Sequence, residues 1–161
     1  MWGGLETLVS YGVDIPDHIT QDSIVRGEVL PAEYERLSEM LNEKVPTHHH
    51  DFLNSLDLHV QIGDYLFVHA GIRPNVPLEK QSLQDLMCIR DVFIEHKGAH
   101  EYRIVHGHEI SNDVVIEHNH IGVDTGLYVH GCLSCVALER NQVEVLQVKK
   151  EISKVWTRPK V

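Results

Sequence analysis

The fold is decided by one stretch of the chain, residues 63–74, which has the sequence GDYLFVHAGIRP. Its short apolar run, residues 66–68, is bounded by Gly63-Asp64 before it and by Ala70-Gly71 after it. Continuous apolar residues with aromatic and β-branched character between such breakers are typical of a buried core strand. The pattern therefore predicts that His69 lies at the carboxyl end of a strand.

A second stretch, residues 103–108 with the sequence RIVHGH, follows the same pattern of apolar residues and then histidines beside a glycine. In open α/β sheets, ligands collect outside the carboxyl ends of the strands. Two strands that both end in histidine therefore predict a shared site, which contains His69 and a histidine of the second stretch. The pattern alone does not choose between His106 and His108.

The composition is that of a globular protein with the length of one domain. The chain has 161 residues, 42% of them apolar, and a formal net charge of −10 at pH 7 with a sequence pI near 5.6. An acidic surface attracts neither nucleic acid nor an anionic membrane, so we expect neither as a partner. Three cysteines cannot all pair, no apolar run approaches membrane-spanning length, and the N-terminus carries no signal-peptide pattern. These features predict a soluble cytoplasmic protein.

Periodicity predicts helices before the quoted stretch. They are expected over residues 5–11, ending at Gly12, over residues 31–41, with Pro31 in the first turn, and over residues 46–56. Residues 58–62 alternate in polarity and turn into the central strand, which predicts a hairpin.

After the quoted stretch, a further helix is expected from Ser82 through Ile94. The remainder is expected to form a β-meander, with strands over 113–117, 120–124, 132–138 and 143–148. Residues 1–148 are expected to form one domain, followed by a basic tail over residues 149–161.

Several short motifs, taken in order, resemble those of the bacterial serine/threonine protein phosphatases of the calcineurin-like metallophosphoesterase superfamily. The resemblance runs from residue 3 to about residue 146. Its motifs are GGLETLVSYG at 3–12, FVHAGIRP at 67–74, VPLE at 76–79 with Gln81, DL at 85–86, IRD at 89–91 with Phe93, VHGH at 105–108, and VDTG at 123–126 with Gly131 and Leu133. Each motif is a weak signal alone, and their order and spacing together form a strong one.

The resemblance implies a mixed α+β or α/β fold, similar to part of the four-layer αββα metallophosphoesterase sandwich without its N-terminal strands. It implies a two-metal centre in which His69 and His108 bind one metal, with Mn expected and Fe or Zn as alternatives. Arg90 is implied to hold the substrate phosphate with its two-pronged guanidinium. The implied reaction is hydrolysis of phosphomonoesters, on a phosphoprotein or a small phosphoester, by a metal-bridging hydroxide and without a covalent intermediate.

The chain departs from the family pattern at its N-terminus. The family's D-x-H, GD-x-x-DR and GNHE elements lie before the segment that corresponds to residues 3–12, and this sequence begins at that segment. Two imidazoles and one guanidinium remain, fewer than the three or four protein ligands of a tight transition-metal site. We therefore expect little or no phosphatase activity from this polypeptide alone. Turnover of p-nitrophenyl phosphate with added Mn²⁺ that disappears in His69→Asn would contradict this expectation.

Three other features near the expected site are not expected to bind metal directly. His106 is expected to shape the site beside the metal ligands rather than to bind metal itself. Asp124, directly after an expected strand, either accepts a hydrogen bond from a metal-bound histidine or caps its own turn. The sequence HGCLSC over residues 130–135 is not expected to bind zinc, because Cys132 and Cys135 would point to opposite faces of a strand.

Three functions remain open from the sequence. The first is the C-terminal part of an active protein phosphatase. The second is a non-catalytic binding or regulatory module, which would form a homo-oligomer through the sheet edge that further strands would cover. The third is a dinucleoside polyphosphate hydrolase, since related hydrolases share the histidine elements.

Overall fold

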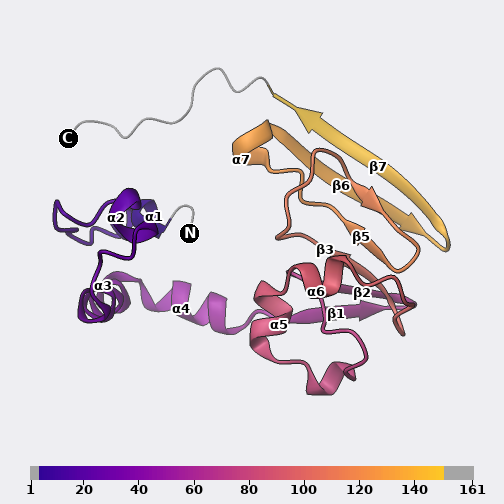
Figure 1. Ribbon diagram of the computed structural model, residues 1–161, viewed down its shortest axis with the longest axis horizontal. Coiled ribbons are helices and arrows are strands. Elements are labelled where there is room, and N and C mark those ends of the chain that lie inside the picture. The colour runs from indigo at the N-terminus through magenta and orange to yellow at the C-terminus, as the bar shows by residue number, and fades with distance from the viewer. Residues whose placement is uncertain (1–3, 151–161) are drawn as a thin grey trace. The chain divides into compact units, whose positions relative to one another are not determined.

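The computed structural model describes residues 4–150, which divide into two compact units with a boundary between Leu56 and Asp57 (Figure 1). Each unit has its own core and is described by itself. The expected tail over residues 149–161 lies outside the described residues except for Lys149 and Lys150, and Lys149 is the last residue of a strand. No helix among residues 4–150 combines the length and the apolar character needed to cross a membrane.

The first unit is helical and consists of α1 (Gly4–Ser10), α2 (Gln21–Val25), α3 (Pro31–Lys44) and α4 (Thr47–Asn54). Its core is formed by four buried aliphatic side chains, Val13, Ile19, Val29 and Leu37. α1 ends before Gly12, which has φ 74°, and α3 begins at Pro31, where the missing N–H costs no helical hydrogen bond. The three helices expected in this part of the chain are confirmed, whereas α2, with five residues, was not predicted.

The second unit is built on a five-stranded mixed sheet with the strand order β1-β2-β3-β5-β4 (Figure 1). Its strands are β1 (His59–Ile62), β2 (Tyr65–Val68), β3 (Arg103–His106), β4 (Val115–Ile116) and β5 (His120–Gly122). β1 and β2 form the expected antiparallel hairpin, whereas β2, β3 and β5 run parallel to one another. Leu66, Ile104 and Ile121 are fully buried on these parallel strands, which confirms the expected core strand.

Short helices cover one face of this sheet. α5 (Leu83–Cys88) and α6 (Asp91–Ile94) contribute Leu86 and Phe93 to a core that they share with Leu66 of β2 and Ile104 of β3. The 3₁₀ helix η1 (Leu78–Lys80) lies in the loop between β2 and α5. The apolar side chains of the parallel strands are thereby sealed from solvent on this face.

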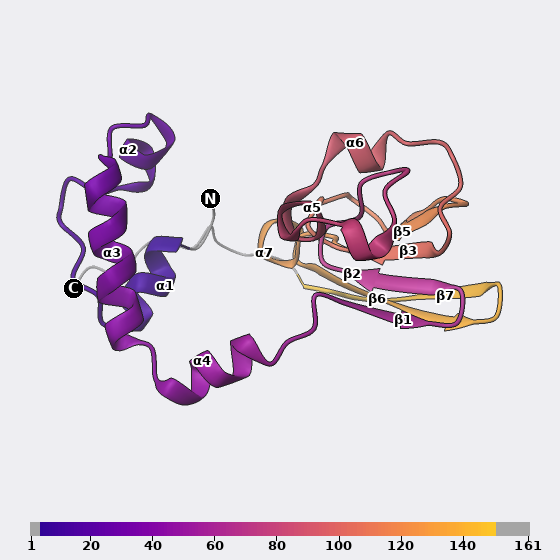
Figure 2. The same cartoon turned by 90° about the horizontal axis from the view of Figure 1, so that it is seen from below.

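A two-stranded sheet lies against the other face and leaves part of β1 exposed there. It is the hairpin of β6 (Cys132–Glu139) and β7 (Gln142–Lys149), preceded by the single helical turn α7 (Leu127–His130). The Tyr65 hydroxyl, on the opposite face of β2 from Leu66, donates to the Arg140 carbonyl in the hairpin turn at 2.9 Å. Figure 1 and Figure 2 together show the order of the layers, which is helices, mixed sheet and hairpin. The expected mixed α+β fold is confirmed.

Two expectations about this unit are wrong. The helix expected from Ser82 through Ile94 is two helices, because Ile89 and Arg90 leave helical geometry and Arg90 has φ −132° and ψ −115°. This break lets Ile89 and Phe93 both enter the core. The expected β-meander is also wrong, since β5 pairs in parallel with β3 and the β6-β7 hairpin forms a separate sheet. Alternation of apolar and polar residues marks a strand but does not identify its partner.

Three imidazoles pack around the Phe93 ring in the core of the second unit, and a fourth packs against one of the three. The ring centroids of His100, His106 and His120 lie 5.7, 4.9 and 5.4 Å from that of Phe93, and the centroid of His96 lies 5.0 Å from that of His100. Burial lowers the pKa of His120 to about 4, with a smaller contribution from the neighbouring His106. Burial likewise lowers the pKa of His100 and of His106. The three rings that contact Phe93 are therefore packed as neutral groups at pH 7.

Lowering the pH from 7 to 5 is expected to destabilise the second unit through His120. The unfolded chain protonates this histidine below its ordinary pKa of 6.5, whereas the folded chain holds its pKa at about 4. The free energy of unfolding should fall by about 2 kcal/mol from this group alone by pH 5. Urea unfolding at both pH values measures the loss, and His120→Leu should reduce it by that amount. The exposed His118→Gln is the matched control, and an equal pH dependence in wild type and His120→Leu would contradict the prediction.

Gly71 packs against the Phe93 ring, two residues after His69. A Cβ at Gly71 would lie 2.4 Å from Cδ1 of Phe93, and the backbone there has φ 152°. Gly71→Ala should therefore lower the free energy of unfolding by about 2 kcal/mol or more. Gly107→Ala is the matched control, because the nearest atom to a Cβ there is the His69 carbonyl oxygen at 3.7 Å. Similar losses for the two variants in urea unfolding would show that the Phe93 contact is not the cause.

Candidate functional site

β2 and β3 lie side by side and bring two histidines together at their carboxyl ends. The strands are parallel neighbours in a register that pairs Phe67 with Val105. Just beyond them, the Gly107 amide donates to the His69 carbonyl at 2.9 Å. The imidazole rings of His69 and His108 have centroids 5.1 Å apart, at an interplanar angle of 60°. The structure therefore brings together the two histidines that the family resemblance selects.

His108 combines a strained backbone with an unused ring nitrogen. Its φ is 65°, and its Nε2 atom is buried with no hydrogen-bond partner among the described residues. Burial lowers the pKa of His108, and repulsion from Arg90 and His69 lowers it further, against an opposing attraction from Glu109 and Asp124. The ring is therefore neutral at pH 7, which is the form of imidazole that binds metals.

The left-handed backbone of His108 gives a prediction about stability. Glycine adopts positive φ without steric cost, whereas alanine keeps the penalty. Both substitutions remove the imidazole, so His108→Gly should be more stable than His108→Ala by about 1 kcal/mol. Urea unfolding of the two variants measures the difference. Equal stability, or a more stable alanine variant, would mean that residue 108 does not adopt this conformation in solution.

His69 and His108 line one cavity of about 280 Å³ together with Asp124. Asp124 follows β5, and its carboxylate accepts a hydrogen bond from the Gly126 amide at 3.0 Å. Of the two roles considered for Asp124, the turn cap is thus present in the structure. Its negative charge also acts on the site, since it partly opposes the lowering of the pKa of His108 by burial.

A chain of hydrogen-bonded side chains joins this cavity to the hairpin. The Thr125 hydroxyl donates to the Cys132 carbonyl at 2.8 Å and lies 2.7 Å from the Ser134 hydroxyl. Gln147 of β7 donates to Ser134 at 3.0 Å and to the Asp113 carboxylate at 2.9 Å. Sequence reasoning gave none of these residues a role at the site. Thr125 could have been singled out because it lies in the VDTG motif. Ser134, Gln147 and Asp113 come together only through contacts between distant segments of the chain, which the sequence does not show.

Arg90 lies at the break between α5 and α6, and its side chain is exposed. Its guanidinium forms an ion pair with Glu109, the residue after His108. Its positive charge reaches His108, because it helps to lower the pKa of that ring. Arg90 is not among the residues that line the cavity. The structure therefore places the guanidinium near the histidine pair and in contact with a carboxylate.

His106 lies in the core beside the site. Only 3% of its surface is exposed, and its ring meets Phe93 edge-on. Its Nδ1 lies 3.0 Å from the Gly107 carbonyl, while its Nε2 is buried without a partner among the described residues. His106 thus contacts the turn that carries His108, and its role as a supporting neighbour stays a prediction.

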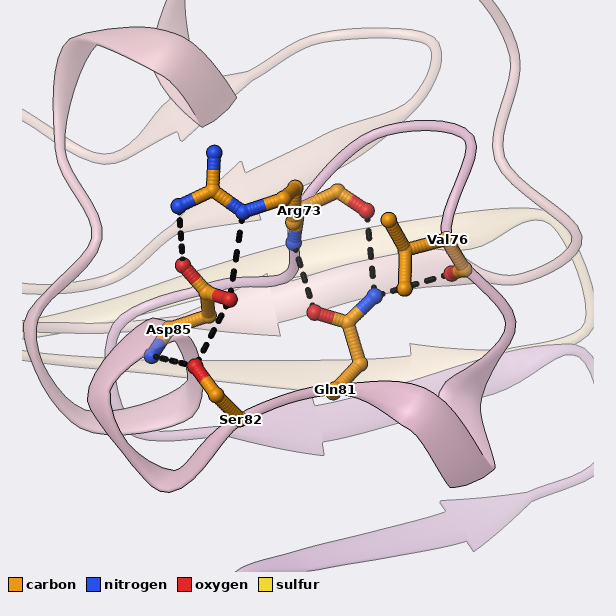
Figure 3. A network of polar contacts seen from close by, with 5 residues as sticks. All are labelled: Arg73, Val76, Gln81, Ser82 and Asp85. Carbon is orange, nitrogen blue, oxygen red and sulfur yellow. Dashed lines mark hydrogen bonds and ion pairs between the residues drawn. The ribbon is translucent and has the colours of Figure 1, made fainter.

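The loop that follows β2 is held by a polar network around Arg73 (Figure 3). The Arg73 guanidinium donates to both carboxylate oxygens of Asp85, from Nη2 at 2.6 Å and from Nε at 3.2 Å. The Gln81 side chain accepts from the Arg73 amide at 2.8 Å and donates to the carbonyls of Arg73 and Val76. Hydrogen bonds from Arg73 and then from Ser82 lower the pKa of Asp85, which therefore stays ionised. The network fixes the loop to the N-terminus of α5.

The residues at the cavity fit a divalent metal in type. Two imidazoles and a carboxylate, from His69, His108 and Asp124, are ligands that Mn, Fe and Zn accept. The buried and unpartnered Nε2 of His108 is the kind of atom that a metal would satisfy. Within residues 4–150, no group of three or more histidine, cysteine, aspartate or glutamate side chains is arranged to hold a metal ion. Among the described residues, the cavity therefore supplies side chains of a suitable type but not a geometry that would hold a metal ion.

Comparisons with known proteins bear on the fold. No protein-family model matches this sequence, and no curated protein matches it. The structure is similar to the crystal structure of a candidate diadenosine tetraphosphatase, with a TM-score of 0.54 and 17% sequence identity. The similarity covers 70% of this chain and 60% of the other, so this chain spans about 60% of the length of that protein. At this identity, the likeness shows a shared fold.

Proposed function

We propose that this chain is part of a metal-dependent phosphoesterase of the serine/threonine protein phosphatase type, in which His69 and His108 bind one divalent metal ion and Arg90 binds the phosphoryl group. One observation carries the proposal: the two imidazoles lie 5.1 Å apart at the carboxyl ends of adjacent strands and line one cavity. The proposed metal is Mn, with Fe and Zn as alternatives. The proposed substrates are phosphomonoesters on proteins or on small molecules.

The side chains of the cavity suit this chemistry. A divalent metal, when bound, stabilises negative charge on phosphoryl oxygens and activates water. An imidazole can bind it only in the neutral form, because a protonated ring has no free lone pair. Burial keeps His108 in that form near neutral pH. The carboxylate of Asp124, in the same cavity, offsets positive charge at the site.

Arg90 would exchange partners when it binds a phosphoryl group. Its guanidinium pairs with Glu109 in the structure. A phosphoryl group presents two oxygens at the spacing that a guanidinium fork matches, so it can take the place of the carboxylate. Glu109 therefore competes with the substrate for Arg90, and it should lower the affinity of the chain for phosphate.

Removing the competing carboxylate is expected to strengthen phosphate binding. Both partners of the ion pair are more than one-third exposed, with side-chain exposures of 56% and 41%. Glu109→Gln should therefore raise the affinity for inorganic phosphate by only about two- to fivefold. Adding Arg90→Gln to the Glu109→Gln chain should abolish this gain. Isothermal titration calorimetry measures both, with the exposed Glu95→Gln as the control. Equal phosphate affinity in wild type, Glu109→Gln and Arg90→Gln would show that Arg90 does not bind phosphate.

The metal-binding part of the proposal is tested by where Mn²⁺ binds. Paramagnetic Mn²⁺ broadens the NMR signals of nearby amides, and we expect the amides of Ala70 and Gly107 to be among the first affected. His69→Asn combined with His108→Asn should abolish this broadening. Asparagine substitutions in the histidine run at residues 48–50 provide the control and should leave it unchanged. Broadening confined to residues 48–50 in the wild-type chain would contradict the proposed site.

A dinucleoside polyphosphate is a second candidate substrate. It is favoured by the shared fold with a candidate diadenosine tetraphosphatase. Titration of wild type and Arg90→Gln with a phosphoserine peptide and with diadenosine tetraphosphate discriminates between the two substrate classes. Tighter binding of the dinucleotide that depends on Arg90 would favour the second function, and tighter binding of the peptide would favour the first.

A further inference from the structure

β1 is an edge strand of the five-stranded sheet, and it carries exposed aliphatic side chains. Among the described strands, β1 pairs only with β2. Leu58, just before the strand, and Val60 and Ile62 within it are 47%, 46% and 63% exposed. Proteins commonly block such an edge with proline, lysine or a bulge, and residues 58–62, LHVQI, contain neither proline nor lysine. This edge is therefore able to accept another strand.

We propose that β1 pairs antiparallel with β1 of a second copy of this chain, across a two-fold axis at Val60. Directly opposed residues of an antiparallel pair lie on the same face of the sheet. Centring on Val60 sets this residue against Val60 of the second copy and Leu58 against Ile62. The exposed aliphatic side chains then meet one another on one face. His59 meets Gln61 on the other face, where the imidazole and the amide can share a hydrogen bond.

The sequence favours this register over its neighbours. A shift by one residue would set the apolar face of one strand against the polar face of the other. Centring on Gln61 would oppose Leu58 with Asp64, and centring on His59 would oppose two imidazoles. An antiparallel edge contact uses the same patch on both copies, as a two-fold dimer requires.

The nearby carboxylates also tolerate this register. With Val60 at the centre, Asp57 faces Gly63 of the second copy and Asp64 faces Leu56. No two carboxylates are directly opposed, so the local charges do not prevent pairing. The whole chain nevertheless has a formal net charge of −10, and two copies repel each other at low ionic strength. Added salt should therefore strengthen the dimer.

The pairing is expected to be weak and reversible. Five residues at a sheet edge bury less surface than a standard protein interface, which places the contact in the transient class. Main-chain hydrogen bonds supply affinity in such edge pairing, and the facing side chains set the register. The dimer should consequently appear at high protein concentration, independently of metal or phosphate.

Disulfide trapping tests the register. With the exposed Cys88 and Cys135 replaced by serine, Val60→Cys should form a linked dimer under mild oxidation, because opposed β carbons in an antiparallel pair lie about 5 Å apart. Ile62→Cys alone should not link, whereas a mixture of Leu58→Cys and Ile62→Cys chains should. Val92→Cys is the matched control, since Val92 is a 56% exposed valine on α6.

Sedimentation analysis of the full chain tests the association without cross-links. The weight-average sedimentation coefficient should rise with concentration for wild type and for Val92→Lys, and it should stay at the monomer value for Val60→Lys. Three results would overturn the proposal. They are a monomeric wild type at the highest concentrations, self-linking of Ile62→Cys as efficient as that of Val60→Cys, and a Val60→Cys thiol that a maleimide cannot reach because another segment covers β1.

Discussion

The parallel pairing of β2 with β3 is the constraint on which the rest of the site depends. The register that sets Phe67 beside Val105 makes the two strands end side by side, and the hydrogen bond from the Gly107 amide to the His69 carbonyl extends this pairing beyond the strands. The histidine pair follows from this arrangement, because the two rings are 39 positions apart in the chain. A slip of one residue would turn alternate side chains to the opposite face and separate the rings.

The loop after β2 is held from two sides. On one side, Phe93 is fully buried among imidazoles and leaves no room for a side chain at Gly71. On the other side, Arg73 is tied to Asp85 and its main chain to Gln81 (Figure 3). Binding sites need a rigid support if their side chains are to keep their geometry. Packing and charge here supply that support at the strand end that carries the first histidine.

The sequence predicted what has a local cause. The apolar run at residues 66–68, Gly12 after α1 and Pro31 at the start of α3 each act within a few residues, and the elements they predict are confirmed. The break between α5 and α6 could not be predicted, because Ile89 leaves the helix to reach a core built by distant strands. The pairing of β5 with β3 and the polar links between Thr125 and the hairpin could not be predicted either, because they too join segments that are distant in the sequence. The motifs that carry His69 and His108 are local, and the family resemblance chose His108 over His106, whereas the closeness of the two rings depends on the pairing of β2 with β3.

A crystal structure of the protein loaded with Zn²⁺, with the metal located by its anomalous scattering, tests the proposed site most directly. We predict one metal position within about 2.1 Å of a ring nitrogen of both His69 and His108. Metal found only elsewhere, for example at the histidines of residues 48–50, would contradict the proposal. So would a pair of rings that point into separate parts of the core.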